Sequence, residues 1–170
     1  MPYWTDLVVE GEVIDLSHLE PFEFLLIPLG LNGDAAISVR FHDHCFSESF
    51  DPAKHLSAMR TNQASSSELR AFSLERYELS KLLPEIIRRM DGQRIASTRE
   101  GNLLKITLQN GQTYPVFFTM RRASRRRVEL FVVSAYVWDR QTPPATTGSM
   151  KFNLAVAKIL KGEKPAFPTR

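Results

Sequence analysis

The sequence predicts an α+β fold: an antiparallel β-meander with helices packed on one side, preceded by a β-rich N-terminal part. Short apolar segments separated by turn residues between 94 and 138 predict the meander. An apolar stripe at three- and four-residue spacing between 74 and 90 predicts the helical part, and period-two alternation between 35 and 46 predicts an N-terminal strand. The length of 170 residues is typical of one domain, which we expect to span residues 1–170.

The first 70 residues are predicted to be mainly extended. Apolar runs predict strands at Leu7–Val9, Val13–Ile14 and Phe22–Ile27. In the strand from Ala35 to Phe46, one set of alternating residues is apolar and the other polar: Ile37, Val39, Phe41 against Ser38, Arg40, His42, His44. The polar, serine-rich residues 57–68 predict a loop.

The segment Leu74–Met90 is the clearest helical prediction, because its leucines and isoleucines recur on one helical face. Pro84 either kinks this helix or lies in the first turn of a second helix capped by Ser80 or a neighbour. Asp91-Gly92 is expected to end it.

Residues 74–140 are predicted to combine this helix with the meander, whose strands we expect at 94–98, 103–108, 114–120 and 128–138. Asn110-Gly111 is its strongest hairpin signal. The proline-rich residues 141–148 predict a linker, followed by a C-terminal helix over 149–161.

The composition excludes several classes of protein. A single cysteine allows no internal disulfide and no cysteine-based zinc knuckle, and no apolar run is long enough to span a membrane. The N-terminal residues show no secretory signal, so we expect a cytoplasmic protein without contact to a membrane. No phosphate-binding glycine loop or paired-carboxylate motif is present, and we expect no cofactor.

The net charge of +3 hides a division along the chain. Residues 1–80 carry five Lys/Arg against thirteen Asp/Glu, whereas residues 81–140 carry twelve against five. The two parts either neutralise each other or leave the basic part facing a polyanion.

The basic part contains five arginines in seven residues: Arg121, Arg122, Arg125, Arg126 and Arg127. We expect them at the tip between two strands. Guanidinium groups bind phosphate in a bidentate manner, which favours RNA or another polyanion over a plain solvated turn. An acidic surface of this chain, or of an inhibitor or partner protein, is the alternative.

The segment Arg40-Phe-His42-Asp-His44-Cys45 is the second candidate site. On a strand, His42 and His44 would share a face about 7 Å apart. Acid–base catalysis by one imidazole, with Arg40 stabilising negative charge, competes with a purely structural role and with metal binding completed by His55 or a carboxylate.

Ser134 and Tyr136 form the third candidate site, near the end of the last strand. Polar residues in an otherwise apolar strand indicate either a cleft or merely the solvent side of the sheet.

Residues 75–140 resemble the barnase/colicin-tRNase/RelE-like ribonuclease superfamily, in particular its phage-associated members. The resemblance is carried by the segments Leu82–Ile87, Arg94-Ile95, Arg121-Arg122 and Leu130–Tyr136. It implies metal-independent RNA cleavage by the 2′-hydroxyl, with Arg121 or Arg122 binding the scissile phosphate and Ser134 or Tyr136 orienting it. The matching segment has no histidine, so the base would be His42 or His44.

From the sequence we therefore expect a protein that binds RNA, with metal-independent ribonuclease activity of the toxin or phage type. The nucleic acid would be bound by Arg40, Arg122, Arg125, Arg126 and Arg127. A non-catalytic phage- or plasmid-encoded regulator or inhibitor is the alternative from another class, and a metal enzyme built on His42 and His44 is a third.

Overall fold

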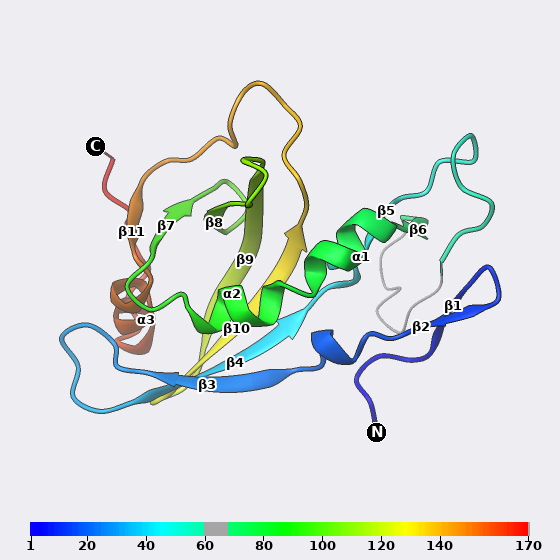
Figure 1. Cartoon of the computed structure of the whole chain (residues 1–170). Helices are drawn as coiled ribbons and strands as arrows, with labels where there is room; N and C mark the ends of the chain where they lie inside the picture. The colour runs from blue at the N-terminus through cyan, green and yellow to red at the C-terminus, as the bar shows by residue number, and fades with distance from the viewer. Residues whose placement is uncertain (60–67, 170) are drawn as a thin grey trace.

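A computed structural model, which describes residues 1–59 and 68–169, shows the expected α+β fold (Figure 1). The strands are β1 (Leu7–Val9), β2 (Glu12–Ile14), β3 (Phe22–Leu26), β4 (Ala35–Phe41), β5 (Ser47–Ser49), β6 (Arg70–Phe72), β7 (Arg94–Ser97), β8 (Asn102–Thr107), β9 (Thr113–Ser124), β10 (Arg127–Ala135) and β11 (Ser149–Lys151). The α-helices are α1 (Leu74–Ser80), α2 (Leu83–Arg88) and α3 (Phe152–Leu160), and the 3₁₀ turns are η1 (Ser17–Leu19) and η2 (Asp43–Cys45).

Seven strands form the main sheet, in the order β11-β7-β8-β9-β10-β4-β3. The predicted meander is present as β7 to β10, each strand antiparallel to the next. The sequence did not predict that β4 pairs with β10 in parallel. The N-terminal part therefore completes the meander's sheet. The small sheets β1–β2 and β5–β6 lie at the end of the molecule opposite α3 (Figure 1).

The two faces of this sheet differ. One face is buried in the core, where alternate residues of the central strands pack with residues of α2 and α3: Ile37, Val39, Phe41, Val128, Leu130, Val132, Leu83, Ile87, Phe152 and Val156. The intervening residues of the same strands, such as Arg40, Thr119 and Phe131, remain partly or fully exposed. We call this second surface the open face.

The segment predicted as helical forms two separate helices and not one kinked helix. α1 ends at Ser80, and Pro84 lies in the first turn of a separate helix, α2, where a missing backbone N–H has no consequence. Ser80 does not cap α2, because its hydroxyl donates to the Tyr77 carbonyl oxygen within α1. Gly92, with φ of 76°, follows the end of α2.

Four predicted boundaries were clearly wrong. β10 ends at Ala135 and not at 138. β4 ends at Phe41, because the chain turns into η2 instead of continuing to Phe46. β9 runs through the first arginines to Ser124, so the turn before β10 is only two residues long. The predicted C-terminal helix starts at Phe152, because residues 149–151 pair with β7.

Most of the loop predicted at 57–68 lies outside the described residues. Among the residues that the structure describes, no helix is long and apolar enough to cross a membrane.

Candidate nucleic-acid interface

A groove of about 620 Å³ crosses three neighbouring strands on the open face. Its walls come from β4, β9 and β10, with Tyr3 at one side: Arg40, His42, Thr119, Met120, Arg121, Glu129 and Phe131. We call it the arginine groove. The strand register produces it, because Arg121 lies opposite Glu129, and Phe131 lies between Thr119 and Arg40.

Glu129 organises the charge of this groove. One of its oxygens, Oε2, accepts hydrogen bonds from Arg40 at 3.4 Å and from Arg121. The Arg121 guanidinium holds the pKa of the Glu129 carboxyl below its usual range. Two cations thus share one carboxylate, and the groove keeps a net positive charge that can bind an anion.

His42 lies at the end of the arginine groove and contacts a buried carboxylate. Its Nδ1 is 2.7 Å from Oδ1 of Asp43, whose side chain is 4% exposed. The backbone N–H of His44 donates a hydrogen bond to this nitrogen, at 3.3 Å. In the neutral ring, Nδ1 of His42 therefore carries the lone pair and Nε2 carries the proton.

The expectation that His42 and His44 lie 7 Å apart on one strand face was wrong. The 3₁₀ turn η2 brings their rings edge to face, with centroids 4.2 Å apart. Nε2 of His44 is buried and has no hydrogen-bond partner among the described residues. Burial and the positive charge of Arg70 lower the pKa of His44 to about 4, so this imidazole is neutral and weakly basic at pH 7.

The nitrogen and oxygen atoms of His42, Asp43 and His44 lie within 4.8 Å of one another, close enough to hold a metal ion. Charges of both signs surround these atoms. Burial and Arg70 lower the pKa of His44, while Asp43 and Glu68 act in the opposite direction.

Ser134 and Tyr136 line a second hollow of about 270 Å³, which we call the aromatic pocket. A β-bulge in β10 between Val132 and Ser134 places them there. Val132 points into the core, opposite Phe118, and the extra residue lets Ser134 face Phe117 on the open face. Without this bulge, strand alternation would turn Ser134 into the core.

Three aromatic rings form a column at the aromatic pocket. Phe117 and Tyr136 stack with centroids 5.9 Å apart, and Tyr136 and Trp138 stack at 6.0 Å. The Arg76 guanidinium lies 4.7 Å from the centre of the Tyr136 ring, and Arg140 lies 5.2 Å from that of Trp138. This pattern of stacked rings flanked by guanidinium groups is typical of surfaces that bind single-stranded nucleic acid.

Arg76 connects the two hollows. It donates hydrogen bonds to the backbone oxygens of His44 and Ser47, at 3.3 and 2.7 Å, while it covers Tyr136. His44 in turn contacts His42 in the arginine groove. The residues predicted as catalytic therefore lie on one face but in different places. His42 and Arg121 line the arginine groove, and Ser134 and Tyr136 line the aromatic pocket. His44 lies between the groove and the pocket, in contact with His42 and Arg76.

The arginines predicted to bind nucleic acid are dispersed. Arg122 follows Arg121 on β9 and so points to the opposite side of the sheet. Arg126 donates to the backbone oxygens of Asn32 and Asp34, and Arg127 pairs with Glu23 at 2.9 Å. Arg125 is exposed at the turn.

Asp43 and Arg76 were not among the site residues expected from the sequence. Asp43 was considered only as a structural partner of the two histidines that flank it, and the structure places its carboxylate 2.7 Å from His42. The role of Arg76 could not be predicted from the sequence, because the residues that it contacts, in η2 and at Tyr136, are about 30 to 60 positions away in the chain.

A protein-family model described as the YjaZ family matches residues 6–160. The chain belongs to the YjaZ family. The match spans both the N-terminal part and the meander, so the family includes the whole open face. A comparison with curated proteins found no match, and a comparison with solved structures found none either. The description of the family states no activity, and the function is therefore argued from the geometry of the open face.

Proposed function

We propose that this protein binds single-stranded RNA on the open face of its sheet. The observation that carries the proposal is the column of Phe117, Tyr136 and Trp138 on the same face as the arginine groove. Bases stack on aromatic rings in a sequence-tolerant way, while guanidinium groups bind the phosphates that link them. An RNA strand lying along β9 and β10 would meet both kinds of group.

The charge division of the chain supports this proposal only in part. Arg127 forms an ion pair with Glu23 of the acidic N-terminal part, whereas Arg126 donates only to backbone oxygens there, so a carboxylate neutralises one of the four arginines nearest the turn, 122 and 125–127. Arg40 and Arg121 retain exposed guanidinium groups, with 46% and 74% of their side chains accessible. An acidic inhibitor that covers these two residues would compete with RNA for the same groove.

A second activity, metal-independent RNA cleavage, is favoured by the position of His42 in the arginine groove, beside Arg40 and Arg121. Its imidazole, next to the buried Asp43 carboxylate, is the kind of group that accepts a proton near neutral pH. If a phosphate binds Arg40 and Arg121, His42 would take the proton of the adjacent 2′-hydroxyl. The 2′-oxygen would then attack phosphorus and form a 2′,3′-cyclic phosphate, while the bond to the 5′-oxygen breaks and that oxygen takes a proton from water. His44 is a poor base for this step, because burial lowers its pKa to about 4.

RNA binding is tested by fluorescence anisotropy with a labelled single-stranded RNA of about 12 nucleotides at several salt concentrations. We expect Arg121→Ala to weaken binding several-fold and to reduce the salt slope by about one. Arg89→Ala is the matched control, because Arg89 is similarly exposed and also pairs with a glutamate but lies at the C-terminal end of α2. Equal losses in both variants would contradict the proposal, as would tighter binding of DNA of the same sequence.

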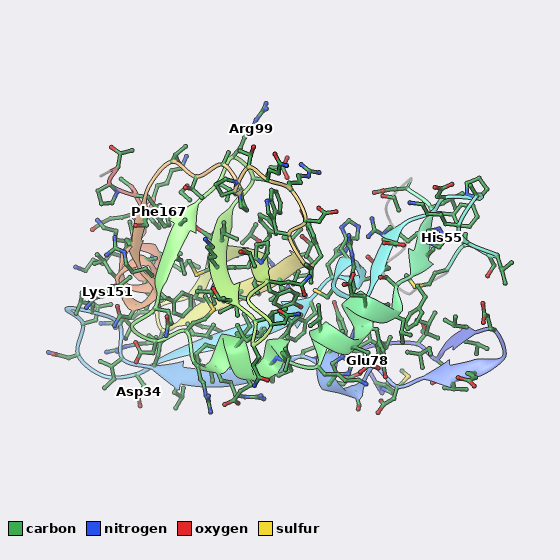
Figure 2. The ribbon with its side chains drawn as sticks, turned by 45° about the horizontal axis from the view of Figure 1, so that its top comes forward. Asp34, His55, Glu78, Arg99, Lys151 and Phe167 are labelled. Atoms are coloured by element: carbon green, nitrogen blue, oxygen red, sulfur yellow. The ribbon has the colours of Figure 1, made fainter. Side chains whose placement is uncertain are left out.

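Cleavage is tested by incubating the same RNA with the protein in EDTA. We expect products with cyclic phosphate ends and a loss of at least about 100-fold in His42→Ala. His55→Ala serves as control, because His55 lies in the distant β5–β6 part and pairs with Glu48 (Figure 2). Intact RNA with the wild-type protein would remove the cleavage activity and leave the binding proposal standing.

A further inference from the structure

The aromatic pocket has the shape of a subsite for a small planar group. Its lining comes from the β7–β8 turn, from Phe117 and Val133 on β9 and β10, and from Tyr136, Trp138 and Pro144 in the segment after β10. Its volume of about 270 Å³ lies near the lower end of the range for small-molecule pockets, about 300–1,000 Å³. It therefore fits one ring system better than a folded ligand.

The wall formed by the β7–β8 turn is held close to the sheet by Gly101. A Cβ on this residue would lie 2.8 Å from the backbone oxygen of Phe118 and 3.1 Å from the Thr119 side chain. The backbone φ of 156° also disfavours a larger residue. The narrowness of the pocket is thus built into the backbone.

Polar side chains without intramolecular partners line this otherwise apolar pocket. Glu100, Asn102 and Ser134 form no side-chain hydrogen bond or ion pair with any other described residue. Together they offer a carboxylate acceptor, an amide with both donors and an acceptor, and a hydroxyl group. A few polar groups at the edge of an apolar pocket are the arrangement that fixes the orientation of a bound ring.

Cationic side chains lie against the aromatic rings of the pocket and on its rim. Arg76 covers Tyr136, and Arg140 covers Trp138. Arg99 belongs to the pocket rim, and its side chain extends outward from the β7–β8 turn (Figure 2). A ligand with a planar ring and a negatively charged group outside the pocket would match both features.

We propose that the aromatic pocket holds one unpaired nucleobase and selects among the four bases by hydrogen bonds from Asn102 and Ser134. The inference rests on the proposed RNA binding and deepens it: the arginine groove supplies affinity through phosphates, and the pocket supplies base preference. A site that hydrogen-bonds a ligand discriminates strongly against ligands that leave its polar groups unpaired.

The test is a titration with the four nucleoside 5′-monophosphates, followed by quenching of Trp138 fluorescence. Trp4, the other tryptophan, is 5% exposed and donates to the Leu19 oxygen, so its signal should stay constant. We expect one base to bind at least about tenfold more tightly than the weakest. Asn102→Ala and Ser134→Ala should reduce that ratio, and Tyr136→Leu should weaken all four nucleotides. Thr107→Ala, exposed on β8 outside the pocket, should change nothing.

Two outcomes would overturn the inference in distinguishable ways. Equal binding of the four nucleotides, unaffected by Asn102→Ala, would show that the pocket does not read bases. If labelled RNA still depended on Arg121, the proposed function would survive that result. Absence of any RNA binding by the wild-type protein would overturn both proposals. Tyr136→Leu keeps an apolar side chain, and a second variant, Tyr136→Phe, keeps the ring and should retain most of the binding.

Discussion

At the scale of single residues, Glu129 sets how strongly the arginine groove attracts an anion. Its Oε2 accepts from both Arg40 and Arg121, so it neutralises part of the charge that RNA would meet. The carboxylate also holds both guanidinium groups in place. The negative charge of Glu129 should therefore weaken RNA binding, whereas its hold on the two guanidinium groups should strengthen it.

Glu129→Gln should strengthen RNA binding several-fold at low salt, because removal of one negative charge raises the potential of the groove. The glutamine oxygen can still accept a hydrogen bond, so positioning is largely kept. Anisotropy at two salt concentrations measures the change, and the gain should shrink as salt rises. Weaker binding at low salt would show that the ion pairs matter more than net charge.

The half-buried position of His44 predicts that stability falls in mild acid. Its pKa is about 4 in the folded protein and near 6.5 when unfolded, so only the unfolded chain binds this proton between those values. The free energy of unfolding should therefore decrease as pH falls from 6.5 towards 4, by at most about 3 kcal/mol from this group.

Urea unfolding at pH 7.0, 5.5 and 4.5 measures this effect in the wild-type protein and in His44→Gln. The variant should show a flatter dependence. Burial also lowers the pKa of His18, so some decline will remain. Identical slopes in the two proteins would refute the assignment.

The sequence could predict which residue types carry the candidate site but not which of them meet. Arg40, His42 and Arg121 were recognisable from charge and alternation, and they do line one groove. The burial of Asp43 could not be predicted, because it depends on the turn η2. The alternating pattern of β4 continues through these residues, so the sequence predicts a strand there. The contact of Arg76 with Tyr136 depends on packing between α1 and the end of β10.

At the scale of elements, the bulge in β10 decides what the open face can bind. A regular strand would place Val132 and Ser134 on the same face. The extra residue instead leaves Val132 buried and turns Ser134 towards Phe117. Period-two reasoning from sequence cannot locate such an insertion, because nothing in the pattern Val132-Val133-Ser134 marks it.

Paired substitutions test the bulge. Val132→Ser should destabilise the protein by about 2–4 kcal/mol, because it removes buried apolar volume and buries a hydroxyl. Ser134→Val should change stability by only about 0.5 kcal/mol, as is usual for surface positions. Chemical denaturation measures both. Similar, large losses would show that Ser134 is a core residue.

At the scale of the whole molecule, the acidic and basic parts share one sheet. β4 from the acidic part lies between β10 and β3, and Arg127 pairs with Glu23 across this junction. The α+β class and the meander were predictable from local periodicity. The parallel pairing of β4 with β10 was not, because about 90 residues separate the partners.

This architecture predicts that the helix and meander cannot fold without the N-terminal part. A fragment of residues 74–170 would expose one edge of β10 and remove the packing partners of Val128, Leu130 and Val132. We expect a fragment without cooperative thermal unfolding by circular dichroism. A cooperative transition would show instead that the meander is an independent unit.

The central claim is that RNA lies on the open face, and photochemical cross-linking tests it most directly. RNA containing 4-thiouridine is irradiated with the full-length protein, and cross-linked peptides are identified by mass spectrometry. The account predicts cross-links at Phe117, Phe131, Tyr136 or Trp138, which are lost at high salt. Cross-links confined to α2, α3 or the β1–β2 sheet would contradict it.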